Sequence, residues 1–467
     1  MRRVLIVLIC SLVFVPVVYA GSEPVVPREP NVVLMLFDDA DRSDMPLMPH
    51  VMRDVANAGA TFDRFYATQS LCCPSRASLL TGEYVHNHGV YSDSPKSGGG
   101  FDEFFTQGDE TAALPAQFAS RGYVTGLFGK YLNGYGLGRS FGHVPPGWDR
   151  WFGTFEQTYY NWEVNDDHIL RRYLFKPADY EDAVVDHNAS EWIRRVHRQP
   201  FFAYIAVGAP HGPYHAPPGI TETFEGAVPP SFRRPDFNER DVSDKPRYVR
   251  NLPRFTANDL AGIKERYRRR LQQMLYDDQA LGAIVRQLRR EHVLDKTYIV
   301  VTSDNGWMQG EHRFADKKSV PYEEDVNLPL FIRGPGIEAG RHISQLTSMI
   351  DLYPTFLDMF GRRSDRDGRS LLPLLFGQPT AWRKQLLLEN FWGREDSVPK
   401  FFGIESERYK YIEYDTGERE FYDLKTDPYE LRNLVTTAPR ALVRSWAAKL
   451  RALRVCAGDS CRVADSS

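Results

Sequence analysis

The sequence predicts an α/β fold with a large, mostly parallel mixed sheet, followed by a smaller α+β unit with an antiparallel sheet. Short, continuous apolar runs recur at residues 32–37, 123–128, 201–207, 298–302 and 330–333. Such runs are typical of strands that are buried on both faces of a parallel sheet. Segments with helical spacing separate them, and strands that alternate with helices indicate a layered α/β sandwich.

The clearest helix is expected over about residues 257–291, where apolar residues recur at mostly three- and four-residue steps. After Pro373 the pattern changes to short, partly alternating runs, followed by a last helix; these lie at residues 386–388, 408–414, 420–423 and 439–453. We therefore predict a domain boundary near residues 377–380. It divides the chain into a large unit, 21–377, and a C-terminal α+β unit, 378–467.

The composition describes a folded protein without a net charge that would attract nucleic acid. The 467 residues are 42% hydrophobic and 13% aromatic, which is enough to build a core. The 58 Lys and Arg residues nearly balance the 61 Asp and Glu residues, so the formal charge of −3 provides no basic field for sequence-independent binding. We therefore expect no nucleic-acid partner.

The first twenty residues have the pattern of a secretory signal peptide. Arg2 and Arg3 precede a mostly apolar run over 4–18, and Ala20 is a small residue suited to cleavage. A membrane anchor is the alternative, but the run is short for a membrane span. We therefore predict that residues 1–20 are removed and that the protein is exported without a stable membrane span. Whether it is secreted, periplasmic or lysosomal depends on the host.

Export would permit disulfides and glycosylation. Among the five cysteines, Cys10 lies in the signal, whereas Cys456 and Cys461 are spaced for a small disulfide loop. Asn188 begins an Asn-Ala-Ser triplet, which is a glycosylation acceptor only in a host that uses that pathway.

The most informative segment is Cys72-Cys-Pro-Ser-Arg-Ala-Ser-Leu-Leu-Thr-Gly82. It resembles the signature of the type I sulfatases, Cys-x-Pro-Ser-Arg followed by Leu-Thr-Gly, in which a formylglycine-generating enzyme oxidises the first cysteine to formylglycine. Cys72 has Pro74 and Arg76 at the required spacing, whereas Cys73 does not. The resemblance therefore implies that Cys72 is the modified residue, that the sandwich is alkaline-phosphatase-like, and that the protein is a sulfuric ester hydrolase.

Formylglycine suits this reaction because a hydrated aldehyde carries two hydroxyl groups on one carbon. One hydroxyl can attack sulfur, and the other can later expel sulfate and restore the aldehyde. In the family, a metal ion lowers the pKa of the attacking hydroxyl and polarises the sulfate oxygens. Such an ion needs oxygen ligands.

Two polar pairs, each following a predicted strand, match the metal site of the family. They are Asp38 with Asp39 and Asp304 with Asn305, and modified Cys72 completes the set. Three carboxylates and an amide oxygen form a hard ligand set, which favours one Ca²⁺ per chain over Mg²⁺ or Mn²⁺. The His86-x-His88 pair lacks partners at zinc spacing, so we interpret these histidines as pocket lining or hydrogen-bonded structure.

The resemblance also assigns the groups around the sulfate. Lys130, in the block Gly-Lys-Tyr-Leu-Asn133, matches a lysine that contacts sulfate and formylglycine. His211 matches a histidine near the leaving oxygen, Lys318 matches a later lysine, and Arg76 holds the formylglycine in place. We expect Lys130, Asn133, His211 and Lys318 to bind substrate.

Two assignments stay open. Arylsulfatases commonly have a histidine where this sequence has Leu132, so the base of the elimination step is either His211, acting in both half-reactions, or His312, which we also expect to bind substrate. The spacing to Tyr322 selects Lys318 as the later lysine, whereas the spacing from the preceding histidine block does not separate it clearly from Lys317.

Further blocks resemble sulfatases over nearly the whole mature chain, and three segments are most similar to the N-acetylglucosamine-6-sulfatase branch: 130–133, 243–247 and 456–461. This implies a sulfated sugar, such as N-acetylglucosamine 6-sulfate in glycosaminoglycans, or an aryl sulfate as substrate. Two alternatives are a phosphate mono- or diester or phosphonate hydrolase of the same superfamily, and a catalytically silent glycan-binding protein. The Pro- and charge-rich stretch 214–255 is too long for a simple connection, and we expect it to face the substrate.

Overall fold

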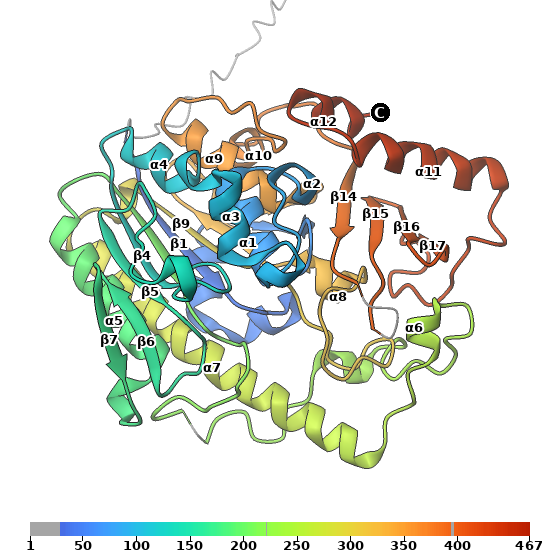
Figure 1. Cartoon of the computed structure of the whole chain (residues 1–467), viewed down its shortest axis with the longest axis horizontal. Helices are drawn as coiled ribbons and strands as arrows, with labels where there is room; N and C mark the ends of the chain where they lie inside the picture. The colour runs from blue at the N-terminus through green and yellow to red at the C-terminus, as the bar shows by residue number, and fades with distance from the viewer. Residues whose placement is uncertain (1–28, 221, 394–396) are drawn as a thin grey trace, which may run out of the picture.

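The computed structural model describes residues 29–220, 222–393 and 397–467, so the predicted signal peptide at 1–20 lies outside the described residues. A ten-stranded sheet forms the centre of the molecule (Figure 1). Its strands are, in spatial order, β12 (Arg341–Ile343), β2 (Ala60–Phe62), β11 (Leu330–Arg333), β9 (Thr297–Ser303), β1 (Asn31–Phe37), β8 (Phe201–Ala206), β4 (Val124–Lys130), β5 (Arg150–Thr154), β6 (Trp162–Asp166) and β7 (Ile169–Tyr173).

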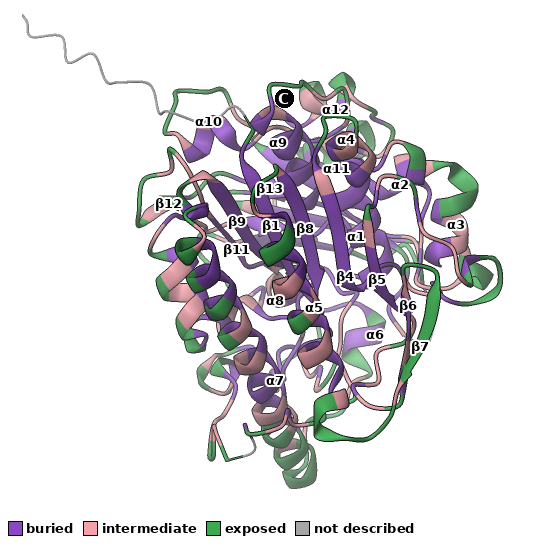
Figure 2. Cartoon of the chain, turned by 90° about the vertical axis from the view of Figure 1, so that its left-hand side faces the viewer, coloured by how far each residue is buried: buried purple, intermediate pink, exposed green. Residues whose placement is uncertain are grey.

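The five neighbouring strands from β9 to β5 are parallel, whereas β11, β6 and β7 pair antiparallel with their neighbours. The predicted α/β fold with a mostly parallel mixed sheet is therefore confirmed. The hairpin of β6 and β7 was not expected from the sequence. Strand β7 is mostly exposed at the edge of the sheet, and Figure 2 shows it in green beside the buried central strands.

The central strands are apolar throughout because helices cover both faces of the sheet. Alternate residues of β1 enter two different cores, with Val32, Leu34 and Leu36 on one face and Val33, Met35 and Phe37 on the other. The first core includes residues of α1 (Cys72–Thr81), α3 (Gly100–Gln107), α4 (Leu114–Ala119), α9 (Leu352–Met359) and α10 (Leu372–Leu375). The second includes residues of α5 (Glu181–Val196) and α7 (Ala257–Arg290).

Helix α7 confirms the longest predicted helix and has clear end signals. Thr256 and Asp259 form a reciprocal capping box at its amino end, and Arg289 and Arg290 lie in its last turn, where the helix dipole favours positive charge. Its buried stripe includes Tyr267, Leu271 and Met274 at three- and four-residue steps.

The predicted C-terminal antiparallel sheet is also present. It contains β14 (Gln385–Asn390), β15 (Phe401–Ser406), β16 (Tyr409–Tyr414) and β17 (Arg419–Asp423), and α11 (Arg440–Leu453) packs against it (Figure 1). Strand β15 was not expected. A small sheet of β10 (Asn327–Leu328), β3 (Phe65–Tyr66) and β13 (Thr347–Ser348), and the short helices α2 (Val85–His88), α6 (Arg247–Arg250), α8 (Glu323–Val326) and α12 (Asp459–Ala464), complete the α and β elements of the described residues.

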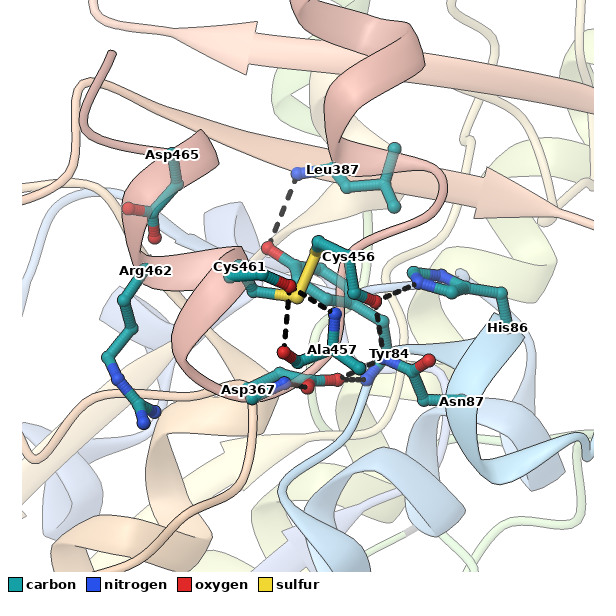
Figure 3. The surroundings of a disulfide bond; sticks show 12 residues. Tyr84, His86, Asn87, Asp367, Leu387, Cys456, Ala457, Cys461, Arg462 and Asp465 are labelled. Atoms are coloured by element: carbon teal, nitrogen blue, oxygen red, sulfur yellow. Dashed lines mark hydrogen bonds between the residues drawn. A yellow bond between two sulfur atoms is a disulfide. The ribbon is translucent and has the colours of Figure 1, made fainter.

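The expected disulfide between Cys456 and Cys461 is present, and it lies against α2 (Figure 3). The carbonyl oxygen of Cys456 accepts hydrogen bonds from His86 Nε2 at 2.8 Å and from Asn87 Nδ2 at 2.9 Å. Burial lowers the pKa of His86, but the contacts with Glu389 and the Cys456 carbonyl outweigh this effect, so the pKa of His86 is raised. His86 therefore belongs to hydrogen-bonded structure, one of the two interpretations that the sequence left open.

Candidate active site

Four neighbouring parallel strands carry polar side chains to one edge of the large sheet. Asp38 and Asp39 follow β1, Asp304 follows β9, His211 lies in the loop after β8, and Lys130 is the last residue of β4. The order β9, β1, β8 and β4 places these four carboxyl ends side by side. Ligand sites of open α/β sheets form at this edge, because the chain leaves the sheet there in loops that can hold polar groups.

Cys72 begins helix α1 and points into this group of side chains. Its Sγ lies 3.3 Å from Asp38 Oδ1 and 2.8 Å from Lys318 Nζ, and the residue is buried. Burial and the nearby Asp38 raise the pKa of the Cys72 thiol well above its usual value, although Lys130 and Lys318 oppose the shift. Cys73 instead packs in the first core. The structure therefore brings Cys72, and not its neighbour, to the carboxylates.

Three carboxylates and Cys72 form a cluster that could hold a metal ion. One ligand atom from each of Asp38, Asp39, Cys72 and Asp304 lies within 4.8 Å of the others, and all four residues are buried. Asn305 Nδ2 donates to Asp39 Oδ1 at 2.6 Å. Asp39 Oδ2 and Asn305 Oδ1 are buried without a hydrogen-bond partner. Such orphaned oxygens are costly in a protein interior, and a bound cation would satisfy them.

Arg76 and Lys130 compensate the negative charge on one side of this cluster. Arg76 is fully buried and donates to Asp304 Oδ2 at 2.8 Å, to Asp38 Oδ2 at 3.1 Å and to the Lys130 carbonyl at 2.8 Å, and Lys130 Nζ contacts Asp38. Burial raises the pKa of Asp38, but Lys130, His211 and Arg76 lower it more, so Asp38 remains ionised. Arg76 thus joins two carboxylates of the cluster and the end of β4.

Lys318, rather than Lys317, reaches the cluster. Lys318 Nζ lies 2.6 Å from Asp39 Oδ1, and Asp39 and Cys72 raise the pKa of this lysine well above its usual value against the opposing effect of burial. Lys317 Nζ instead donates to Ser397 Oγ at 3.2 Å. The geometry agrees with the lysine that the spacing to Tyr322 selects.

His211 is the partly exposed member of the group. Its Nδ1 donates to the Gly212 carbonyl at 2.5 Å, and its Nε2 lies 3.9 Å from Asp39 Oδ2. The side chain is 34% exposed, so it can reach both solvent and the cluster. Because a carbonyl oxygen only accepts, Nδ1 carries a proton, and Nε2 is free to act as a base in the neutral ring or as an acid in the charged ring.

Two residues that the sequence predicts to bind substrate, His312 and Asn133, have no described contact with the cluster. His312 is fully buried, its Nδ1 contacts Glu239 Oε2 at 2.6 Å, and its ring packs on Tyr322. Burial lowers the pKa of His312 to about 3, so the ring stays neutral. The described contacts of His312 thus join it to Glu239 and Tyr322 and not to the carboxylate cluster, so they favour His211 over His312 as the elimination base. None of the contacts described for Asn133 joins its side chain to the cluster either; its side-chain oxygen is buried and lacks a partner.

Arg270 on α7 also lies at the site, and it was not among the residues expected from the sequence. This arginine is fully buried and donates to the Asp39 carbonyl at 2.6 Å and to the Pro210 carbonyl at 3.3 Å, so it holds two loops of the site together. A signal was present in the sequence. Arg270 lies next to Leu271 on the apolar stripe of the helix, where an uncompensated charge is rare.

Comparison with known proteins identifies the family. The sulfatase family model matches residues 30–362, which is well over half of the chain. The chain belongs to the sulfatase family. A second model, the C-terminal region of N-sulphoglucosamine sulphohydrolase, matches residues 310–455. The protein is therefore a sulfuric ester hydrolase of a metal-dependent family, with an acidic cluster that could hold the ion.

Two relatives in the curated proteins support this assignment. Human N-acetylglucosamine-6-sulfatase is 31% identical over 478 residues, which cover 93% of this chain and 86% of that protein. The extracellular sulfatase SULF-1 homolog of Drosophila melanogaster is 33% identical over 387 residues, which cover 79% of this chain but 34% of that protein. This sulfatase thus spans about a third of the length of the Drosophila relative.

Solved structures share the fold of this sulfatase. One, solved in complex with its substrate D-glucosamine-2-N,6-O-disulfate, has a TM-score of 0.72 and 24% identity and covers 94% of this chain and 99% of its own. The phosphonate monoester hydrolase of Agrobacterium radiobacter has a TM-score of 0.69 and 22% identity and covers 91% of this chain and 96% of its own. At this identity the likeness concerns the fold alone. No helix in the described part of the sulfatase is long and apolar enough to span a membrane.

Proposed function

We propose that this sulfatase hydrolyses sulfate esters of sugars, and that the 6-sulfate of N-acetylglucosamine in glycosaminoglycan chains is its substrate. The observation that carries the proposal is the relationship to human N-acetylglucosamine-6-sulfatase, which extends over 93% of this chain. A fold alone would leave the reaction open, because a phosphonate monoester hydrolase shares it. Aryl sulfates are the second substrate class, since their leaving groups need less assistance from the enzyme.

We propose that Cys72 is the residue that becomes formylglycine, with a formylglycine-generating enzyme as partner during maturation. Its position among Asp38, Asp39 and Lys318 supports this proposal, because Cys73 packs in the core instead. When formed and hydrated, the aldehyde supplies one hydroxyl as nucleophile and a second that expels sulfate. A thiol in the same place lacks this second group.

Asp38, Asp39, Asp304 and Asn305 would hold one Ca²⁺ beside residue 72. Three carboxylates and an amide oxygen fit a hard cation, and Asp39 Oδ2 and Asn305 Oδ1 offer buried oxygens without hydrogen-bond partners. A bound ion supplies charge stabilisation to the sulfate oxygens and lowers the pKa of a nearby hydroxyl. Mg²⁺ or Mn²⁺ would fit less well, because this set can provide several protein oxygens and Mg²⁺ prefers to keep its waters.

The lysines and histidine then have separate tasks. Lys130 and Lys318 flank residue 72 with ammonium groups that neutralise the sulfate oxygens as negative charge develops on them. The bond between sulfur and the sugar oxygen breaks, and His211 Nε2 gives its proton to that oxygen, so the sugar leaves as an alcohol. His211 is the histidine at the cluster, and it can return as the base in the second half-reaction. Arg76 keeps Asp38, Asp304 and the end of β4 in place.

We also propose that residues 1–20 act as a signal peptide for export and that residues 21–377 and 378–467 are the catalytic domain and the C-terminal subdomain. The Arg-Arg start and apolar run support the first proposal. The change from the ten-stranded sheet to the antiparallel β14–β17 sheet supports the second.

The proposal is tested by sulfate release from protein coexpressed with a formylglycine-generating enzyme. We expect turnover of N-acetylglucosamine 6-sulfate and of an aryl sulfate, slower turnover of the matching phosphate esters, and an aldehyde mass at residue 72. Cys72→Ala should abolish turnover, whereas the matched control Cys73→Ala should retain it wherever the protein folds. Preference for phosphate esters, or full activity of Cys72→Ala, would contradict the proposal.

A further inference from the structure

A pocket of about 320 Å³ opens directly beside the catalytic cluster. Its lining includes Leu71, the residue before Cys72, and Lys318, whose ammonium contacts the Cys72 sulfur. Two tryptophans, Trp307 and Trp392, line the same pocket. We refer to it as the near pocket.

The two tryptophans of the near pocket differ in what their rings can do. Trp307 is engaged by Lys318 and by Arg270, whose charged groups lie 5.7 and 5.2 Å from its ring centroid. Trp392 is 42% exposed and has no ring or cation contact in the described part of the chain. An exposed aromatic side chain in the wall of a pocket can stack against a ligand.

A second pocket of about 380 Å³ lies next to the first. Asp316, Lys317, Ser397 and Val398 line both pockets, so the two pockets are adjacent, and we refer to the pair as the groove. We refer to the second as the far pocket. Its other walls include Tyr248 and Phe255.

The far pocket is built from parts of the chain that are distant in sequence. Tyr248 belongs to α6 and Phe255 to the stretch 214–255, whereas Val398 comes from the C-terminal part. Figure 1 shows α6 and the amino end of α7 below the β14–β17 sheet, where these parts meet. The long stretch after β8 thus contributes a wall of the groove.

We propose that this groove binds a sulfated oligosaccharide, with the sulfated residue in the near pocket against Trp392 and the next sugar in the far pocket against Phe255. This inference rests on the proposed function and adds a second sugar site to it. Sugar rings fit such a groove because their C–H faces stack on aromatic rings while their hydroxyl groups meet polar side chains such as Asp316 and Ser397.

The test compares substrates of different length on the fully modified enzyme. The substrates are N-acetylglucosamine 6-sulfate and a disaccharide and a tetrasaccharide that carry the same sulfate on their terminal residue. The variants are Trp392→Ala, Phe255→Ala and the control Phe175→Ala, which removes an exposed aromatic ring outside the groove. Formylglycine content and Tm are measured for each, so that lost folding is not mistaken for lost binding.

We expect the wild type to prefer the longer substrates. Phe255→Ala should lower kcat/KM about tenfold for the disaccharide and tetrasaccharide and less than about twofold for the monosaccharide, as loss of one aromatic contact predicts. Trp392→Ala should raise KM about tenfold for all three with kcat nearly unchanged, and Phe175→Ala should behave as wild type. The proposed binding groove would be contradicted if Phe255→Ala lowered kcat/KM equally for all three substrates, or if Trp392→Ala lowered kcat without changing KM. If the wild type hydrolyses none of these sugars, the proposed function fails and the groove with it.

Discussion

Replacing Lys318 by alanine is the sharpest test of how the site handles sulfate. The ammonium lies 2.6 Å from Asp39 Oδ1 and 2.8 Å from Cys72 Sγ, and its side chain is 15% exposed. It is thus a mostly buried positive charge beside the residue that we propose as the nucleophile. Removing one such preoriented donor lowers kcat by about 10²–10³, or about 2.7–4 kcal/mol in the activation barrier. We expect a loss of this size for Lys318→Ala.

Lys317→Ala is the matched control, because the two lysines are adjacent but point to different partners. Lys317 Nζ contacts Ser397 Oγ and has no described contact with the carboxylate cluster. Because Lys317 lines the groove, its loss is expected to change KM, whereas we expect kcat on an aryl sulfate to change less than about threefold, since the described contact of its ammonium is with Ser397. Lys318→Arg keeps the charge and should recover part of the loss, although the planar guanidinium cannot reproduce the ammonium geometry.

The assay is the initial rate of sulfate release from an aryl sulfate over a range of concentrations, so that kcat and KM are separated. The aldehyde content of residue 72 is measured by mass spectrometry in each variant, because incomplete modification would also lower kcat. Rates are then expressed per modified chain. A Lys318→Ala enzyme within about threefold of wild type, or a larger loss for Lys317→Ala, would refute the reasoning.

Three further predictions concern stability. Removing the metal with a chelator should lower Tm, and Ca²⁺ at about 100 times its Kd should restore about 2.7 kcal/mol; an unchanged Tm would contradict the Ca²⁺ site. Burial lowers the pKa of His88 to about 3. Below about pH 6.5 the unfolded chain therefore binds a proton that the folded chain does not, and the free energy of unfolding decreases as the pH is lowered. Between pH 7 and pH 5 we expect the free energy of unfolding, measured with urea, to decrease by about 2 kcal/mol because of His88, and the His88→Gln variant should lack this decrease. Arg383 and Asp351 form a fully buried ion pair with two contacts of 2.6 Å, so Arg383→Ala should cost about 3–5 kcal/mol in the same assay, and a cost below about 1 kcal/mol would contradict the pairing.

Features that depend on local pattern were predictable. The runs that became β1, β4, β8, β9 and β11 are apolar because both faces of the sheet are covered, and that leaves a mark in the sequence itself. The spacing within the Cys72 block separated the two adjacent cysteines before any geometry was known. The polar pairs after β1 and β9 pointed to one edge of the sheet, because parallel strands end together.

Features that depend on distant pairing were not predictable. Strand β15 has Gly403 at its centre and β7 is mostly exposed, so neither carries a clear alternation; both exist through hydrogen bonds to neighbouring strands. His312 looked like a site residue because it lies in a family block. The fold instead turns it toward Glu239, and a histidine motif contains no information about which carboxylate will lie nearby.

The sequence by itself predicted the fold class, because strand burial is a local property of the chain, and its resemblance to the sulfatases predicted that Cys72, Lys130 and Lys318 lie with the carboxylates. Only the tertiary structure decided that Lys318 rather than Lys317 reaches Asp39, that Arg270 ties two loops together, and that Trp392 and Phe255 share one groove. These side chains come from segments far apart in the chain. Their meeting depends on how helices and sheets pack, and that packing is settled by the whole core at once.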